Sequence, residues 1–165
     1  MTLWRERSIE ERHLLNPSFF SVVLWYAANG YVTKHSPAMP LALSFLVSPF
    51  VLHRPTREVL PRNTATSLAT WLTDQPLIRA RVAERAVALR PFTQEALLFG
   101  GAHQLLALGA DGVCANASMK NAVESSLSQT SNEVRACAKR ADFVGKWFKK
   151  AGTAETVLAL LGVRP

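Results

Sequence analysis

The residues best suited to chemistry are lysines near the carboxyl end of the chain, between Arg135 and Lys150. If this stretch forms a helix with about 100° per residue, Lys139, Lys146 and Lys150 fall in one narrow stripe. Lys149 adds a fourth lysine to the same segment. Such a stripe can bind the phosphates of a nucleic acid or the carboxylates of an acidic partner.

An aromatic residue favours the interpretation of this segment as a contact surface. Phe143 is expected to project close to the lysine stripe rather than into the apolar side of the helix, and Trp147 is expected at the boundary. Lysines interleaved with an aromatic side chain are typical of surfaces that bind phosphates or a protein groove. A solvated lysine face is the alternative. The candidate DNA or partner contacts are Lys139, Phe143, Lys146, Lys149 and Lys150.

The sequence carries none of the common motifs for catalysis, cofactor binding or metal binding. It lacks the Gly-rich phosphate loop, the paired histidines of a zinc hydrolase and the Gly-flanked serine of an esterase. Its four histidines lie far apart in the sequence, and Cys114 and Cys137 do not have the spacing of zinc ligands. We therefore expect no catalytic, cofactor-binding or metal-binding residues, and we expect that the chain is not an enzyme.

The composition points to contacts with other macromolecules. The chain has 165 residues, of which 48% are hydrophobic and 19% are charged, whereas soluble domains have about 25% charged residues. This low charge content suggests that some apolar surface is meant for a partner. The net charge of +7 favours acidic partners, but it is spread too evenly along the chain to mark a nucleic-acid face.

The chain is expected in the cytoplasm and not in a membrane. Two unpaired cysteines fit a reducing compartment, and the charged N-terminal sequence lacks the apolar run of a signal peptide. The ranges 14–33 and 36–52 contain no charged residue and approach the length of a membrane span. Asn, Gly and Pro residues interrupt both ranges, so two helices in a protein core are the better interpretation.

Start and stop signals predict helices through the first half of the chain. An Asn-Pro pair begins a helix over 16–33, and a second helix is predicted over 40–52 with a kink or an early end at Pro49. An exposed connector over 53–63 and a short helix over 66–73 follow. These elements are expected to supply much of the core.

The middle of the chain suggests a winged-helix arrangement. Helices are predicted over 77–90 and 93–109, separated by Pro91, with a short strand at 112–115 and a return near Ala122. Two helices joined by a tight turn and followed by a hairpin resemble a helix-turn-helix module. The second helix has almost no basic or amide side chain for reading bases, so protein pairing is the better use of such a module.

The predicted fold is one mainly α domain over 1–165, a compact helical domain with a winged-helix-like core and at most a short β-hairpin. It has an N-terminal arm at 1–15 and an irregular loop or hairpin at 110–129. Thr130 and Glu133 form a capping box for the lysine-bearing helix. Gly152 ends this helix, and a last helix is predicted between Thr153 and Gly162.

Several phrases of the sequence resemble the middle component of bacterial three-component ABC systems, a family that includes the middle subunit of Lamassu-type anti-phage and anti-plasmid defence. The resemblance covers nearly the whole chain except 110–129. Its phrases are Asn16-Pro17-Ser18-Phe19, Pro40-Leu41, Pro49 to His53, Pro55-Thr56-Arg57-Glu58, Trp71-Leu72, Ala83-Glu84-Arg85-Ala86, Pro91 to Gly100, Ala141 to Phe148, and Leu161 to Pro165.

The resemblance implies a small non-catalytic adaptor. In such systems a coiled-coil ABC ATPase, of the kind found in structural-maintenance-of-chromosomes (SMC) complexes, holds DNA, and a separate effector, often a nuclease, causes the damage. The middle subunit resembles the bridge between the two, with a DNA contact of its own through the lysines as an additional hypothesis. A free-standing winged-helix DNA-binding regulator is the alternative.

Overall fold

The computed structural model describes residues 15–34 and 38–163. The predicted N-terminal arm lies outside the described residues, except for Leu15. In chain order the elements are α2 (Pro17–Tyr31), α3 (Leu41–Val51), α4 (Arg54–Glu58), α5 (Leu68–Asp74), α6 (Pro76–Ala102), β1 (Leu106–Gly109), β2 (Gly112–Ala115), the 3₁₀ turn η2 (Ala117–Met119), α7 (Lys120–Ser128), α8 (Asn132–Ala151) and α9 (Ala154–Leu161). The predicted mainly α fold with one short hairpin is confirmed.

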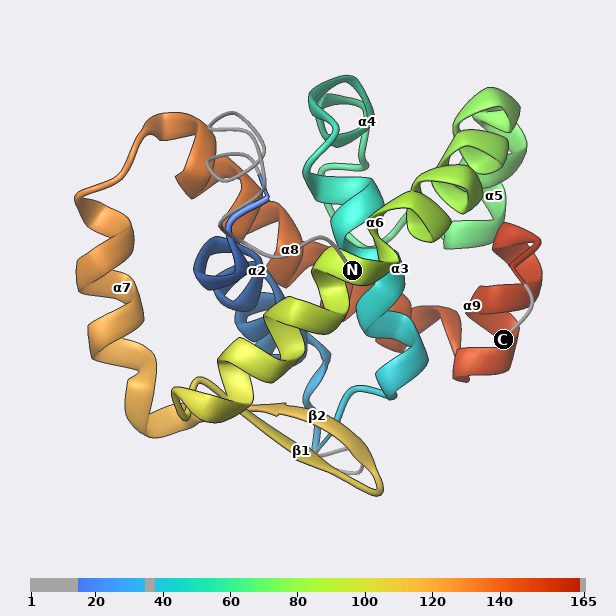
Figure 1. Ribbon diagram of the computed structural model, residues 1–165. Helices are drawn as coiled ribbons and strands as arrows, with labels where there is room; N and C mark the ends of the chain where they lie inside the picture. The colour runs from blue at the N-terminus through green and yellow to red at the C-terminus, as the bar shows by residue number, and fades with distance from the viewer. Residues whose placement is uncertain (1–14, 35–37, 164–165) are drawn as a thin grey trace.

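The centre of the molecule is a layer formed by α2 and α3. Each of these helices packs against both α6 and α8, and Figure 1 shows α6 crossing in front of them while α8 passes behind. The α2 helix begins as predicted, because the Asn16 side chain accepts a hydrogen bond from the Ser18 amide at 2.9 Å and Pro17 occupies the first helical position. Its side chains Phe20, Val23, Leu24, Ala27 and Ala28 are fully buried.

An aromatic cluster joins α3, α5 and α8. The ring of Phe50 lies 5.7 Å from that of Phe148 and 6.0 Å from that of Trp71, measured between ring centroids. Trp71 and Trp147 meet edge to face at 5.4 Å, a geometry that aromatic pairs prefer. The helix α3 contains Pro49 in its last turn and ends two residues later, as the sequence predicted.

The prediction of two helices over 77–109 is wrong, because α6 is one continuous helix with Pro91 inside it. A proline costs one backbone hydrogen bond and strains the preceding turn. Here, buried side chains hold the helix on both sides of it: Val82 and Ala86 before the proline, and Ala96 and Leu97 after it. The turn of a helix-turn-helix module is therefore not formed in this part of the chain.

A β-hairpin follows α6 where the sequence predicted continued helix. Strand β2 lies where it was predicted, but it pairs antiparallel with β1 and not with a segment near Ala122. The backbone of Val113 also exchanges hydrogen bonds with Met39 at 2.8 and 2.9 Å, which attaches the hairpin to the chain before α3. The range 120–128, predicted as irregular, is the helix α7, of which only Val123 is buried.

The ends of the last two helices follow the predicted signals with one exception. Ser131, not Thr130, caps α8 and accepts from the Val134 amide at 3.3 Å. The predicted capping box is not formed, because Glu133 turns toward Arg57 instead. Gly152 ends α8, Thr153 caps α9 and Gly162 ends α9, all as predicted. Gly162 adopts the left-handed conformation.

Candidate contact surfaces

The predicted lysine stripe lies on the outer side of α8. Lys139, Lys146 and Lys150 are exposed, and Lys149 is half-buried. The Lys150 ammonium donates to the Thr64 carbonyl at 2.7 Å, while that of Lys149 lies 5.3 Å from the centroid of the Tyr31 ring. The structure therefore keeps the four cations on one side of one helix, and we call Lys139, Lys146, Lys149 and Lys150 the lysine ridge.

One acidic residue lies inside the ridge and was missed in the sequence. Asp142 Oδ2 accepts from the Lys146 ammonium at 2.6 Å. The signal was present, because residues four positions apart face each other on a helix. This ion pair lowers the net positive charge of the ridge, so Lys139 and Lys150 contribute most of its attraction for anions.

The prediction that Phe143 projects outside the core is wrong, because only 9% of this side chain is exposed. Its ring packs 5.5 Å from that of Trp147, and the Arg140 guanidinium covers it at 4.8 Å. Trp147, expected at the boundary, is buried and donates to the Thr66 carbonyl at 2.8 Å. The connector before α5 passes over this side of α8, and the helical periodicity of α8 could not reveal that. The contact role of Phe143 and the four lysines stays a prediction.

A buried arginine forms a second polar cluster that the sequence did not reveal. Arg57, on the short helix α4, donates to the Val51 carbonyl at 2.6 Å and to Cys137 Sγ at 3.2 Å. Its guanidinium also pairs with Glu133 at the start of α8. Burial raises the pKa of the Cys137 thiol, with the Arg57 charge opposing this effect. The cysteine is thus a buried structural residue, as predicted, and a poor nucleophile.

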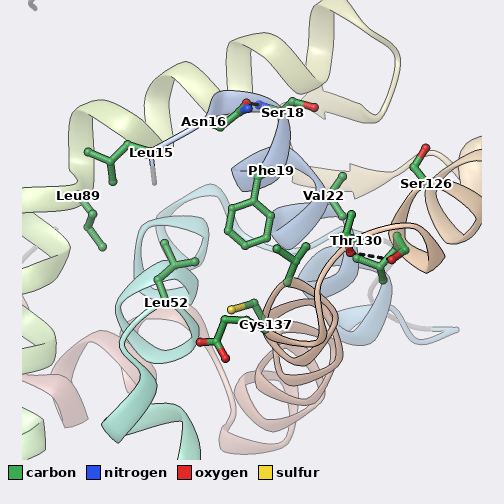
Figure 2. A pocket seen from close by; sticks show the side chains of 13 residues that line it. Leu15, Asn16, Ser18, Phe19, Val22, Leu52, Leu89, Ser126, Thr130 and Cys137 are labelled. Atoms are coloured by element: carbon green, nitrogen blue, oxygen red, sulfur yellow. Dashed lines mark hydrogen bonds between the residues drawn. The ribbon is translucent and has the colours of Figure 1, made fainter. Parts of the chain in front are cut away.

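An apolar hollow of about 610 Å³ opens beside the first turns of α8. Figure 2 shows the Phe19 ring in the middle of the lining side chains, with Leu52 and Cys137 below it and Ser126 to the right. Leu15, which also lines the hollow, directly follows the undescribed N-terminal residues. Most of the surface is hydrocarbon, and the Glu133 carboxylate that reaches it is already paired with Arg57.

The outer side of α6 carries large apolar side chains that the sequence did not place there. The exposed fractions are 78% for Leu77, 74% for Val87 and 68% for Leu98. The low charge content of the chain predicted that apolar surface would be exposed, but composition does not say on which element.

Neither a metal centre nor a membrane span is found in the part of the chain that the structure describes. In 15–34 and 38–163, no three His, Cys, Asp or Glu side chains gather as they would around a metal ion. Over the same residues, every helix is too short or too polar to cross a bilayer.

Comparison with known proteins gives one match. The family model for the ABC-three component (ABC-3C) system Middle Component 3 matches residues 4–165. Neither the curated proteins nor the solved structures include a match to the chain. The matched range covers all described elements from α2 to α9. The chain therefore belongs to the Middle Component 3 family of ABC-three component systems.

Proposed function

We propose that this chain is a non-catalytic adaptor of a cytoplasmic defence complex of the Lamassu type. It bridges an SMC-like coiled-coil ABC ATPase and an effector, in many systems a nuclease. The observation that carries the proposal is the family match over 4–165, since it assigns the whole helical unit, and not an appended segment, to the middle component. The exposed lysine ridge and the exposed apolar side chains of α6 supply surfaces for contact.

The alternative of a free-standing winged-helix regulator is less favoured by the fold. Such a module needs two helices joined by a turn, so that the second can enter the major groove. The continuous α6 removes that turn.

Co-expression with the neighbouring ATPase and effector components tests the adaptor role. The chain should co-elute with both in a fixed stoichiometry that survives moderate salt. A chain that elutes alone in the presence of both components, and that binds one DNA sequence in preference to others, would instead be the regulator.

We also propose that the lysine ridge contacts the DNA held by the assembled complex. Each phosphate contact adds about 0.9 to the slope of log K against log salt. Lys139→Glu combined with Lys150→Glu should therefore reduce the slope for the complex by about 2. The control is Lys120→Glu combined with Arg54→Glu, because Lys120 and Arg54 are also exposed but lie on other helices. If the two variants have equal slopes, the lysine ridge is solvated and does not contact the DNA.

A further inference from the structure

The apolar hollow beside α8 is built by five helices together. Its floor consists of half-buried apolar side chains: Phe19 and Val22 of α2, Leu52 at the end of α3, Leu89 of α6, Leu127 of α7 and Val134 of α8. The first four of these also pack against the main core. A concave apolar surface of about 610 Å³ has the size of a pocket that holds a ligand or several side chains. An apolar surface of this kind is typically covered.

The N-terminal segment of the chain, residues 1–14, joins the described part at the edge of this hollow. Leu15 lines the hollow and packs against the core, and Figure 2 shows it on the same side of the view as Leu89. The Asn16 cap fixes the point at which the chain enters α2. Fourteen residues precede Leu15, and a chain of that length reaches at most about 50 Å when extended. The segment is therefore long enough to leave the edge of the hollow and return into it.

The sequence of this segment combines a large apolar residue with balanced charge. Trp4 is followed by Arg5-Glu6-Arg7, and the segment as a whole contains three arginines and three glutamates. It thus has no net charge that would draw it to an acidic or a basic partner. The family match begins at residue 4, so Trp4 and the residues after it belong to the unit that the family shares.

The hollow suits the chemistry of an indole ring. A buried tryptophan needs apolar contact for the ring and an acceptor for its N–H group. The described tryptophans follow this rule, because each donates to a backbone carbonyl at 2.8 to 3.1 Å: Trp25, Trp71 and Trp147. Beside its apolar floor, the hollow is lined by exposed residues with side-chain oxygens that can accept such a bond: Ser126, Thr130 and Glu133.

We propose that the N-terminal segment of this chain folds back over the hollow and that the Trp4 side chain occupies it, in contact with Leu127 and Val134. A short tether gives the docked segment an effective concentration in the mM range, so the contact does not need the area of a stable interface between two proteins. A small apolar molecule or another protein is a different occupant, and either would leave Trp4 in water in the isolated chain. The proposal does not depend on the adaptor role.

Fluorescence quenching by acrylamide in the full chain tests this arrangement. Trp25, Trp71 and Trp147 are at most 5% exposed, so they contribute little to the quenching. With Trp4 in the hollow, wild type and Trp4→Phe should have the same low Stern–Volmer slope. A wild-type slope clearly above that of Trp4→Phe would place Trp4 in water and overturn the proposal. Shielding that disappears on dilution would place Trp4 in a second copy and would also overturn it.

A charge introduced into the hollow should release Trp4. Leu127 is half-buried on α7, a helix in which only Val123 is buried, so Leu127→Glu changes the hollow and not the core. This variant should have a higher quenching slope than wild type, and adding Trp4→Phe to it should remove the increase. Leu41→Glu is the control, because Leu41 is 50% exposed at the other end of α3 from Leu52, and its slope should equal that of wild type. An unchanged slope in Leu127→Glu would show that Trp4 is shielded elsewhere.

A double-mutant cycle gives a second measurement that does not depend on fluorescence. Trp4→Ala and Leu127→Ala should each lower the urea midpoint of the full chain. The double variant should lose less than the sum of the two, because both substitutions remove the same contact. Trp4→Ala combined with Leu41→Ala is the control and should be additive. Additive losses for Trp4 and Leu127 would overturn the proposal even if Trp4 is shielded from acrylamide.

Discussion

Gly145 of α8 lies directly against the Ala27 carbonyl of α2: a Cβ atom built on Gly145 would be 2.0 Å from that oxygen. One turn away, a Cβ on Gly30 of α2 would be 2.2 Å from the Asp142 carbonyl of α8. Each helix thus places a glycine against the backbone of the other. Helices α2 and α8 can approach this closely only because both positions lack a side chain.

Gly145→Ala is therefore expected to destabilise the protein. Alanine is about 1 kcal/mol better than glycine inside an isolated helix, but here the added methyl group forces α2 and α8 apart. Overpacking of this kind costs about 1–3 kcal/mol, and we expect a net loss of stability in that range. Urea unfolding should show a lower midpoint with an unchanged slope. Gly109→Ala is the control, since nothing lies within 4 Å of its added Cβ, and an equal loss in both variants would contradict the close approach.

Glu133→Gln should cost more than the loss of an ordinary surface ion pair. The Arg57 side chain is 5% exposed, so removing the charge of Glu133 leaves a buried guanidinium without its carboxylate. Hydrogen bonds to charged groups contribute about 1.5–3 kcal/mol, and we expect a loss at the lower end because Glu133 is 54% exposed. Chemical denaturation at low and high salt measures it.

Glu58→Gln is the matched control for this experiment. It breaks the Arg54–Glu58 pair, whose side chains are 69% and 58% exposed, and such exposed pairs contribute little to stability because water screens them. The Glu133 effect should also persist at high salt, since buried pairs are screened less. If both substitutions have the same small effect, Arg57 does not depend on its partner.

Phe143→Ala should lower the free energy of unfolding. The ring is buried between Trp147 and Arg140, and Phe→Ala in a core costs about 3–5 kcal/mol. Lys146→Ala, three residues later on the exposed side, should change the free energy of unfolding by less than about 1 kcal/mol. Thermal unfolding of the isolated chain distinguishes these outcomes. If the Phe143→Ala protein were as stable as wild type, the Phe143 side chain would not contribute to the core.

Stability should fall below about pH 6.5 in a way that depends on His53. Nδ1 of His53 accepts from the Thr56 amide at 3.3 Å and caps α4. Burial lowers the pKa of His53 below its ordinary value of about 6.5, and the charges of Arg85 and Arg81 add to this. The folded state then binds fewer protons than the unfolded state, so the stability present above pH 6.5 is lost as pH falls through the folded-state pKa.

Comparison with His53→Asn isolates this contribution. Asparagine can cap a helix but does not titrate. The difference in unfolding midpoint between wild type and His53→Asn should therefore change between pH 7.5 and pH 5, with wild type losing more. A difference that is constant with pH would show that His53 does not titrate in this range.

Prediction from the sequence was most accurate where a residue type has a single local structural role, as at helix caps and helix ends. The Asn16 cap, the early end of α3 after Pro49, the Thr153 cap and the end of α9 at Gly162 were all predicted correctly. Each depends on backbone geometry within one helical turn, and no distant contact competes with it. The lysine ridge followed in the same way from helical periodicity.

The errors occurred where distant packing overrides a local preference. A proline within a helical sequence usually ends the helix. Contacts on both sides of Pro91 nevertheless keep α6 continuous. Glu133 could cap its own helix, but the buried charge of Arg57 attracts it more strongly. Phe143 lies off the apolar side of α8 by periodicity, yet it is buried against Trp147 and the Arg140 guanidinium.

By itself, the sequence determined a helical protein without a catalytic motif, the family to which it belongs, and the residues that begin and end most helices. The tertiary structure alone decided which apolar side chains remain exposed outside the core. Leu97 and Leu98 are adjacent leucines of one helix, and one is buried while the other is 68% exposed. Burial depends on which neighbours a helix meets, and those neighbours come from segments far away in the chain.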